Sequence, residues 1–193
     1  VVSLVAAQVI NLGVVLFLSV LFFAVSARRP FTGAAEWSVL SLPDGASRDL
    51  DAAQDIEGAA DIRRSYPLQD GQAWRVAAAD AGGFVSLFSA TGGGCGYALA
   101  YVRSPEARKA RIAVRAYGGA KAWLNGRNIL TVSDFGRYPF AAGQEAEASL
   151  AKGWNELLVK ITQKHAFMSF RGEVLGADGR EMTDLTYAVA PGE

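Results

Sequence analysis

The chain has 193 residues, 51% of them hydrophobic, and its 19 basic and 19 acidic residues give a formal net charge of zero. This length accommodates one domain and a membrane anchor, and the balanced charge, without any basic run, argues against a nucleic-acid partner. A single cysteine and a single histidine exclude an internal disulfide and a metal site built from several such ligands, so we expect no cofactor.

Residues 1–29 are predicted to form a transmembrane helix. The run 1–27 has no charged side chain, and about 20 apolar residues suffice to cross the hydrocarbon core as a helix. Pro30 follows the run and stops the helix. A cleaved signal peptide is the alternative, with Val25 and Ala27 as its small-residue cleavage site. The run is longer than the apolar region of a signal peptide, which favours an uncleaved anchor.

A polar stripe on this helix predicts contact with another helix. At about 100° per residue, Gln8, Ser19 and Ser26 fall within about 20° of one another, and Asn11 lies about 60° to the side. Polar side chains in lipid are costly unless they find partners, so the stripe indicates packing against other integral membrane subunits in the lipid bilayer. In the alternative interpretation, the two serines bond to carbonyl groups of their own helix.

Residues 30–71 are predicted to be a connector that contributes a first strand. Glu36–Leu42 alternates between two faces, as a strand does. An acidic, alanine-rich segment, 49–61, comes next. It lacks the loop glycine and the ligand order of an EF-hand calcium site, so a solvated short helix or loop is the favoured interpretation.

Residues 72–190 are predicted to form a β-sandwich domain. The glycine-rich run 91–96 near its start is not followed by Gly-Lys-Ser/Thr and therefore does not make a phosphate-binding loop. We expect an inter-strand loop there, with Cys95 as a small buried residue. The first three predicted strands of the domain are Gln72–Ala77, Phe84–Phe88 and Tyr97–Arg103. Near the end of the chain, Phe167–Leu175 and a closing strand, Glu181–Ala188, are predicted on either side of a hairpin turn at 176–179.

The strongest strand signals lie between residues 110 and 162. Apolar residues alternate with others from Ile112 to Ala116, which predicts a strand with one buried face. Asn125-Gly126 stands between two apolar runs and is typical of a type I′ hairpin turn, because both central residues of that turn need positive φ. Gly153 then precedes the strand Trp154–Thr162, in which Leu157, Val159 and Ile161 share one face. The sequence therefore predicts antiparallel β architecture.

Two motifs in this part of the chain, WLNGR at 123–127 and LAKGWNELLVKI at 150–161, together resemble the galactose-binding-like domain. This resemblance covers roughly residues 72–187. It implies an antiparallel jelly-roll β-sandwich, found as accessory modules in glycosidases and many extracellular proteins, and a binding or scaffolding role. It also implies that Trp123 and Trp154 serve packing. The complete fold expected is all-β, a jelly-roll sandwich preceded by one transmembrane α-helix.

The side of the membrane that carries the sandwich stays open. Arg28, Arg29 and Arg48 follow the predicted helix and no basic residue precedes it, so the positive-inside rule slightly favours the cytoplasm. The resemblance points the other way, because that family is mostly extracytoplasmic. We expect a bacterial-type inner membrane, with either face as an alternative.

An aromatic loop is the predicted partner or glycan surface. Aromatic faces suit sugar rings or a protein partner, and polar neighbours could orient such a ligand. In the alternative interpretation, these aromatic side chains close one end of the sandwich. The residues of this predicted surface are Asp134, Phe135, Arg137, Tyr138 and Phe140.

No catalytic arrangement stands out in the sequence. His165, the single histidine, lies in a predicted turn with no serine-elbow motif elsewhere in the chain. We therefore expect a non-catalytic, single-pass membrane accessory subunit, whose helix packs in a multi-subunit complex and whose sandwich docks on a neighbouring subunit. A membrane-tethered carbohydrate-binding module is the alternative.

Overall fold

The computed structural model describes residues 31–42, 49–52, 55–58, 73–87, 94–133, 143–163 and 168–191. The chain divides after Pro30, and the unit that begins at Phe31 contains every described residue. Within these ranges, no helix is long and apolar enough to cross a membrane. The predicted anchor, residues 1–29, lies outside the described residues and stays a prediction, as does its stripe of Gln8, Asn11, Ser19 and Ser26.

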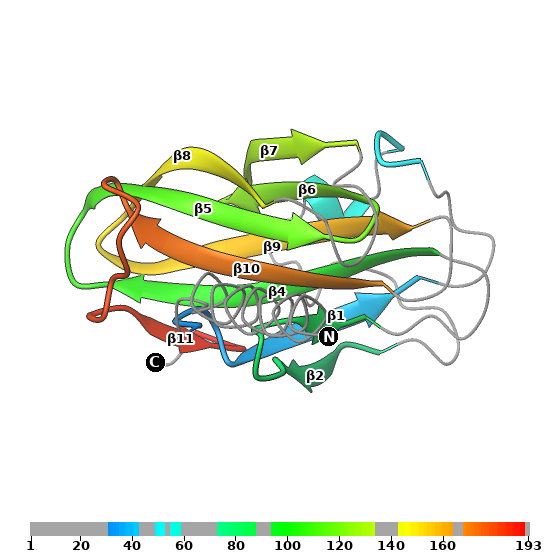
Figure 1. Cartoon of the computed structure of the whole chain (residues 1–193), viewed down its shortest axis with the longest axis horizontal. Helices are drawn as coiled ribbons and strands as arrows, with labels where there is room; N and C mark the ends of the chain where they lie inside the picture. Colours follow the sequence, from blue (N-terminus) through cyan, green and yellow to red (C-terminus); the bar gives the residue numbers. More distant parts are fainter. Residues whose placement is uncertain are drawn as a thin grey trace, which may run out of the picture. The chain divides into compact units, whose positions relative to one another are not determined.

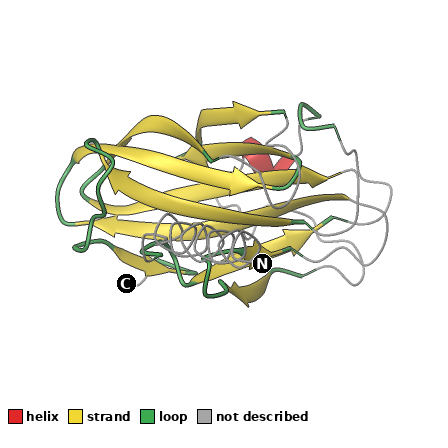
Figure 2. Ribbon diagram, in the orientation of Figure 1, coloured by secondary structure: helices red, strands yellow, loops and turns green. Residues whose placement is uncertain are grey.

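The described part of the chain is built almost entirely of strands, with a single 3-10 turn, η1 (Figure 2). In chain order the elements are β1 Glu36–Ser41, η1 Asp55–Gly58, β2 Arg75–Ala78, β3 Val85–Ser86, β4 Gly94–Ser104, β5 Arg108–Ala116, β6 Gly119–Leu124, β7 Arg127–Val132, β8 Gln144–Leu150, β9 Gly153–Gln163, β10 Ser169–Gly176 and β11 Thr186–Ala188.

These strands form two antiparallel sheets that lie one over the other. The larger sheet has the order β2-β1-β4-β9-β6-β7, and β11 pairs with β4 beside this path; the smaller sheet has the order β3-β10-β5-β8. Figure 1 shows β5 and β10 crossing in front of β9 and β4. Side chains from both sheets share one buried core. The expected all-β, antiparallel sandwich is therefore confirmed.

The core follows the alternation of the strands. Leu157, Val159 and Ile161 of β9 are at most 1% exposed and face the smaller sheet. Ile112 and Val114 of β5 are equally buried and face the larger one. Both sets were predicted from their period of two. Side chains thus interdigitate between the sheets, as in other β-sandwiches.

The β6–β7 hairpin has the predicted turn. Asn125 has a φ of 51° and Gly126 a φ of 75°, which is the pair of positive values that a type I′ turn requires. The register shifts between Ala122 and Trp123. The shift is a β-bulge, so both Ile129 and Leu130 of β7 pack against the core.

Three strand predictions need correction. β2 begins at Arg75 rather than Gln72, and β3 has two residues rather than five. β4 begins at Gly94, so part of the predicted glycine-rich loop is strand. Glycine suits this position because a Cβ on Gly96 would lie 2.9 Å from Cδ2 of Leu87 and 3.1 Å from the carbonyl oxygen of Leu40, so a side chain there would require these neighbours to shift.

The end of the chain also departs from expectation. The turn after β10 was predicted to lead into a strand paired with β10. Instead, β11 pairs with β4 of the other sheet, and a single bridge, Leu175 to Glu181, remains beside β10. The chain therefore passes from the smaller sheet to the larger one after β10, and β11 becomes part of the larger sheet.

Candidate functional site

The predicted aromatic surface lies outside the described residues. Asp134, Phe135, Arg137, Tyr138 and Phe140 all belong to the stretch between β7 and β8 that is not described, and His165 belongs to the one between β9 and β10. Their roles stay predictions. The described residues show two other features with functional content, an open sheet edge at β8 and a buried polar cluster on the larger sheet.

β8 is the longest and most regular open edge among the described strands. All seven residues, Gln144–Leu150, pair with β5 in one unbroken register, and β8 ends the smaller sheet. Within the described residues, no backbone hydrogen bond joins β8 to any strand other than β5. One row of its N–H and C=O groups therefore has no backbone partner in the part of the chain that the structure describes, and such a row is a template for another strand.

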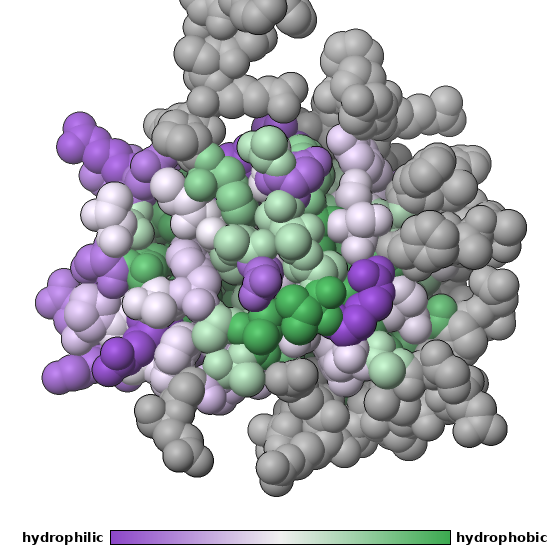
Figure 3. Space-filling view, turned by 90° about the horizontal axis from the view of Figure 1, so that it is seen from below, coloured by the Kyte–Doolittle hydropathy of each residue, from purple (hydrophilic) through white to green (hydrophobic). Residues whose placement is uncertain are grey.

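The other sheet edges are blunted by shortness or by a bulge. β3 has two residues, β11 three and β2 four, and β7 carries the bulge opposite Ala122 and Trp123. Hydrophobic residues gather in the middle of the edge that carries β2 and β11, and polar ones lie toward its left end (Figure 3). Val76 of β2 is 53% exposed there. Short and bulged edges resist the addition of a strand, so β8 differs from the rest.

A groove of about 440 Å³ runs beside β8, between the edges of the two sheets. Ala110 and Ala148 are directly opposite one another in the β5–β8 ladder and face the core side. Their small side chains leave room next to Leu124 and Ile129 of the hairpin. The remaining lining residues are Lys109, Arg111, Arg127, Asn128, Glu147, Ser149 and Ala177. Its lining is more polar than apolar in all, with small or apolar side chains on the core side, and its size suits a small ligand or an inserted side chain.

The outer side of β8 is acidic. Glu145 and Glu147 alternate with the alanines, so their carboxylates lie on the face turned away from the core. Glu145 accepts from Nη1 of Arg111 at 3.3 Å. No ion pair or hydrogen bond within the described residues involves the side chain of Glu147. A free carboxylate beside an unpaired strand edge favours a cationic partner.

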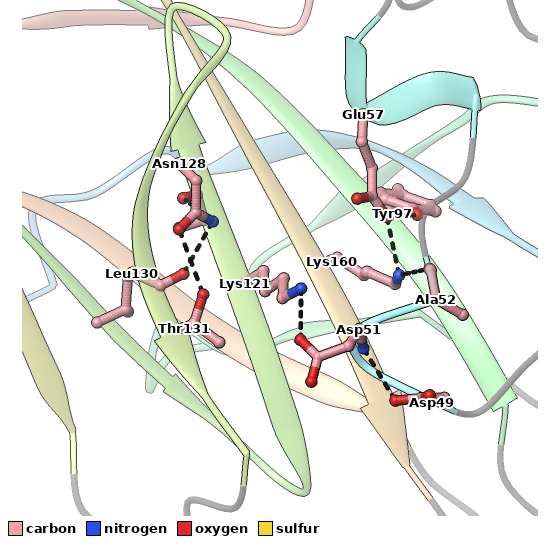
Figure 4. A network of polar contacts seen from close by, with 11 residues as sticks. Asp49, Asp51, Ala52, Glu57, Tyr97, Lys121, Asn128, Leu130, Thr131 and Lys160 are labelled. Atoms are coloured by element: carbon pink, nitrogen blue, oxygen red, sulfur yellow. Dashed lines mark hydrogen bonds and ion pairs between the residues drawn. The ribbon is translucent and has the colours of Figure 1, made fainter.

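The second feature is the Lys160 cluster, which we define as Lys160, Glu57 and Tyr97. Nζ of Lys160 donates to Oε1 of Glu57 at 2.8 Å and to the carbonyl oxygen of Ala52 at 2.6 Å. The hydroxyl of Tyr97 donates to the same Oε1 at 2.7 Å. Figure 4 shows these side chains converging between η1 and the outer face of the larger sheet. The side chain of Lys160 is fully buried and that of Glu57 is 14% exposed.

This cluster corrects the prediction for the acidic segment. Residues 49–61 were expected to be solvated, yet Ile56 is fully buried in a second apolar cluster on the outer face of the larger sheet. Asp51 adds an exposed contact, 2.7 Å from Nζ of Lys121. Because Lys160 is buried and already satisfied, the cluster fastens the segment to the sheet and leaves no free amine for chemistry.

Cys95 lies on the same face as the Lys160 cluster and is buried, as predicted. Burial raises the pKa of its thiol from 9.0 to about 11; the ammonium of Lys160 opposes this rise and the carboxylate of Glu57 adds to it. The folded chain therefore binds this proton more tightly than the unfolded chain does. Stability from this group is complete below pH 9 and is lost as the pH rises toward 11.

We expect the urea midpoint of the protein to fall between pH 9 and pH 11, and to fall less in Cys95→Ala. Burial and the Glu173 carboxylate raise the pKa of Tyr187 as well. This residue changes the stability of both proteins by the same amount, so it does not affect the difference between their urea midpoints. Urea titrations at a series of pH values measure the difference. Parallel curves for the two proteins would contradict the assignment to Cys95.

Comparison with known proteins adds little to this picture. No family model matches the chain, and no curated protein does. Among solved structures, a β-glucosidase from Kluyveromyces marxianus is 15% identical with a TM-score of 0.46, over 77% of this chain and 17% of that chain. The chain thus spans about a sixth of that enzyme's length.

Two smaller solved structures are also similar. A family 35 carbohydrate-binding module from Clostridium thermocellum is 14% identical with a TM-score of 0.32, over 45% of this chain and 75% of that one. Another from an environmental isolate is 20% identical with a TM-score of 0.36, over 56% and 79%. All three scores are below 0.5, so the antiparallel sandwich rests on the strands of this chain themselves.

Proposed function

We propose that this protein is a non-catalytic, single-pass membrane accessory subunit whose sandwich docks on a neighbouring subunit. The observation that carries the proposal is the open edge of β8, a regular seven-residue strand with unpaired backbone groups. Protein chains generally protect such edges unless another chain covers them. The uncharged run 1–27, with its polar stripe, supports the membrane part of the proposal. A bacterial-type inner membrane is the proposed location, with either face still open for the sandwich.

Purification of the full-length protein from its native membrane in mild detergent tests this role. We expect integral membrane subunits to co-purify in fixed stoichiometry, as measured by mass spectrometry. The double substitution Gln8→Leu and Asn11→Leu removes the hydrogen-bonding groups of the stripe, so it should lower the recovery of those subunits severalfold. Phe17→Leu with Val20→Leu, each at least about 120° from both Gln8 and Asn11 on the predicted helix, is the matched control. A wild-type chain that runs alone overturns the accessory role, and an equal loss of subunits in the control variant overturns the role of the stripe.

A second candidate is a membrane-tethered carbohydrate-binding module of the galactose-binding-like, jelly-roll type. The motifs at 123–127 and 150–161 support the family, and the groove beside β8 supports a ligand site. Arg127 pairs with the core-facing Leu124, so its side chain lies on the groove side of the hairpin and could donate hydrogen bonds to sugar hydroxyls.

Glycan-array binding by the full-length protein tests the second candidate. If the groove holds a saccharide, we expect Arg127→Ala to weaken binding about tenfold or more, since hydrogen bonds to charged groups contribute about 1.5–3 kcal/mol. Arg103→Ala changes an exposed arginine on β4 of the same sheet that does not line the groove, so it should leave binding unchanged. Silence of the array, or equal effects of the two substitutions, would remove the groove as a carbohydrate site.

A further inference from the structure

We infer that the free edge of β8 receives an added strand from a neighbouring subunit, and that this strand alternates basic and apolar residues. The inference rests on the proposed accessory function and names the surface and the chemistry of the contact. Three properties of the edge carry it: its unpaired backbone, the carboxylates on its outer side, and the groove on its inner side.

The backbone of β8 sets the geometry of the added strand. Gln144–Leu150 has one continuous ladder with β5 and no bulge, so the opposite row of N–H and C=O groups is straight enough to continue the sheet. Strand addition of this kind obtains its affinity from main-chain hydrogen bonds and its specificity from alternate side chains. The smaller sheet would gain a fifth strand next to its present edge.

The outer side of the edge selects basic residues. Glu145 and Glu147 lie two positions apart on this face, so they meet alternate residues of any added strand. On the other side of β8, the residue opposite Glu147 is Arg111 of β5. Opposite charges placed directly across a ladder stabilise it, and like charges weaken it.

The inner side of the edge selects apolar residues. Ala146 and Ala148 face the inter-sheet side, where the groove beside Leu124 and Ile129 is open. The alanines fill little of this space, so branched apolar side chains of an added strand would fit above them and bury surface against the hairpin. An alternation of basic and apolar residues satisfies both faces at once.

A second copy of this chain is a poor occupant of the edge. Symmetric antiparallel pairing centred on Glu147 would place this carboxylate opposite its own copy, and pairing centred on Ala146 would place Glu145 opposite Glu147. Both arrangements place like charges directly opposite one another, which weakens a ladder. These two registers therefore favour a different protein as the source of the partner strand.

β5 itself shows the chemistry required. This strand, with the sequence RKARIAVRA, pairs with the edge of β8 opposite the free one. In that ladder Lys109 and Arg111 lie on the outer face, and Ala110 and Ile112 lie on the core face. A synthetic nine-residue peptide with the sequence Arg108–Ala116 is thus a suitable probe for the free edge. A companion peptide with glutamate at positions 109, 111 and 115 is its charge-reversed control.

The test measures binding of the fluorescent probe peptide to the full-length protein in detergent, by anisotropy, and hydrogen exchange of the complex. We expect saturable binding, new protection of amides in β8, and little binding of the charge-reversed peptide. Glu147→Lys should weaken binding up to about fivefold, from the usual range of cross-strand charge pairs. Glu36→Lys, an exposed glutamate at the start of β1 in the other sheet, should have no effect.

Absence of binding, protection outside β8, or equal affinity of the Glu147→Lys protein would overturn strand addition. Co-purification separates this failure from that of the accessory role. If the subunits still co-purify at wild-type level with Glu147→Lys, the accessory role stands and the β8 contact falls. If no subunit co-purifies with the wild-type chain, the accessory role falls. Self-association that Glu147→Lys abolishes would also overturn the inference, because a second copy would then be the occupant.

Discussion

Glu57→Leu is expected to lower the free energy of unfolding by about 3–5 kcal/mol, because it leaves the buried ammonium of Lys160 without its carboxylate. The carbonyl of Ala52 would be the remaining acceptor for Nζ within the described contacts. The side chain of Lys160 is fully buried, so water cannot replace the lost partner without local opening. Urea titration in detergent, followed by tryptophan fluorescence, measures the change.

Lys160→Met is expected to cost less than Glu57→Leu. The carboxylate of Glu57 is 14% exposed and keeps the hydroxyl of Tyr97 as a donor, so it can recover hydration when the lysine is gone. The double variant, Lys160→Met with Glu57→Leu, should have a free energy of unfolding within about 1 kcal/mol of the wild-type value. Replacement of a whole buried ion pair by apolar residues is often neutral or stabilising.

An exposed ion pair supplies the matched control for this cycle. Lys121 reaches Asp51, whose side chain is 79% exposed, so Lys121→Met should change stability by less than about 1 kcal/mol. If Glu57→Leu is as mild as Lys121→Met, the segment around η1 does not depend on the Lys160 cluster. If the losses in free energy of unfolding caused by Glu57→Leu and Lys160→Met simply add in the double variant, Lys160 and Glu57 do not interact in solution.

The strands of the sandwich were predictable where the signal is local. Ile112 to Ala116 and Leu157 to Ile161 repeat with a period of two, and this period alone says which residues share a face. The hairpin was predictable because Asn125-Gly126 carries its own backbone requirement. In each case the information lies within a few neighbouring residues.

The rest of the fold depends on contacts between distant parts of the chain. Alternation placed Lys160 on the face opposite the core, but nothing near it points to Glu57, which lies 103 positions away. The pairing of β11 with β4 joins segments more than 80 residues apart, and no local pattern distinguishes β4 from β10 as its neighbour. The start of β4 was missed because glycine is rare in strands, and its reason, the closeness of Leu87 to Gly96, is also non-local.

The site was predictable only in part for the same reason. Aromatic clusters are visible in a sequence, and they directed attention to the loop 134–140. An open edge depends on the order of the strands in the sheet. β5 has β10 on one side and β8 on the other, so β8 ends the sheet, and no local sequence pattern shows this. The alternation of Glu145 and Glu147 with alanine was the available signal, since it describes a strand with one acidic face and small inner residues.

The other large effect is expected at Asn155, which belongs to the second recognised motif and is completely buried at the junction of three strands. Its Oδ1 accepts from the amide of Ala151 at 2.8 Å and from Nδ2 of Asn125 at 2.9 Å. Its Nδ2 has two hydrogens and lies within hydrogen-bond distance of three carbonyl oxygens, those of Ala151, Gly153 and Val102, at 2.9, 3.1 and 3.3 Å, so one hydrogen is shared between two of them. One amide thus joins the β8–β9 turn, the β6–β7 turn and β4.

Asn155→Ala is expected to lower the free energy of unfolding by about 3 kcal/mol or more, because each lost hydrogen bond contributes about 1 kcal/mol and buried partners are left unsatisfied. The carbonyl oxygen of Gly153 would lose its contact with Nδ2 of Asn155, and Asn125 would lose its own bond to Oδ1, so amide exchange should rise in both turns at once. Asn128→Ala is the control: this asparagine is exposed and its side chain bonds lie within its own hairpin, so the loss should stay below about 1 kcal/mol. Equal losses for the two substitutions would mean that the motif asparagine has no organising role. A larger loss at Asn155, with faster exchange at Asn125 and Ala151, would explain physically why the two motifs, WLNGR and LAKGWNELLVKI, occur together in one chain.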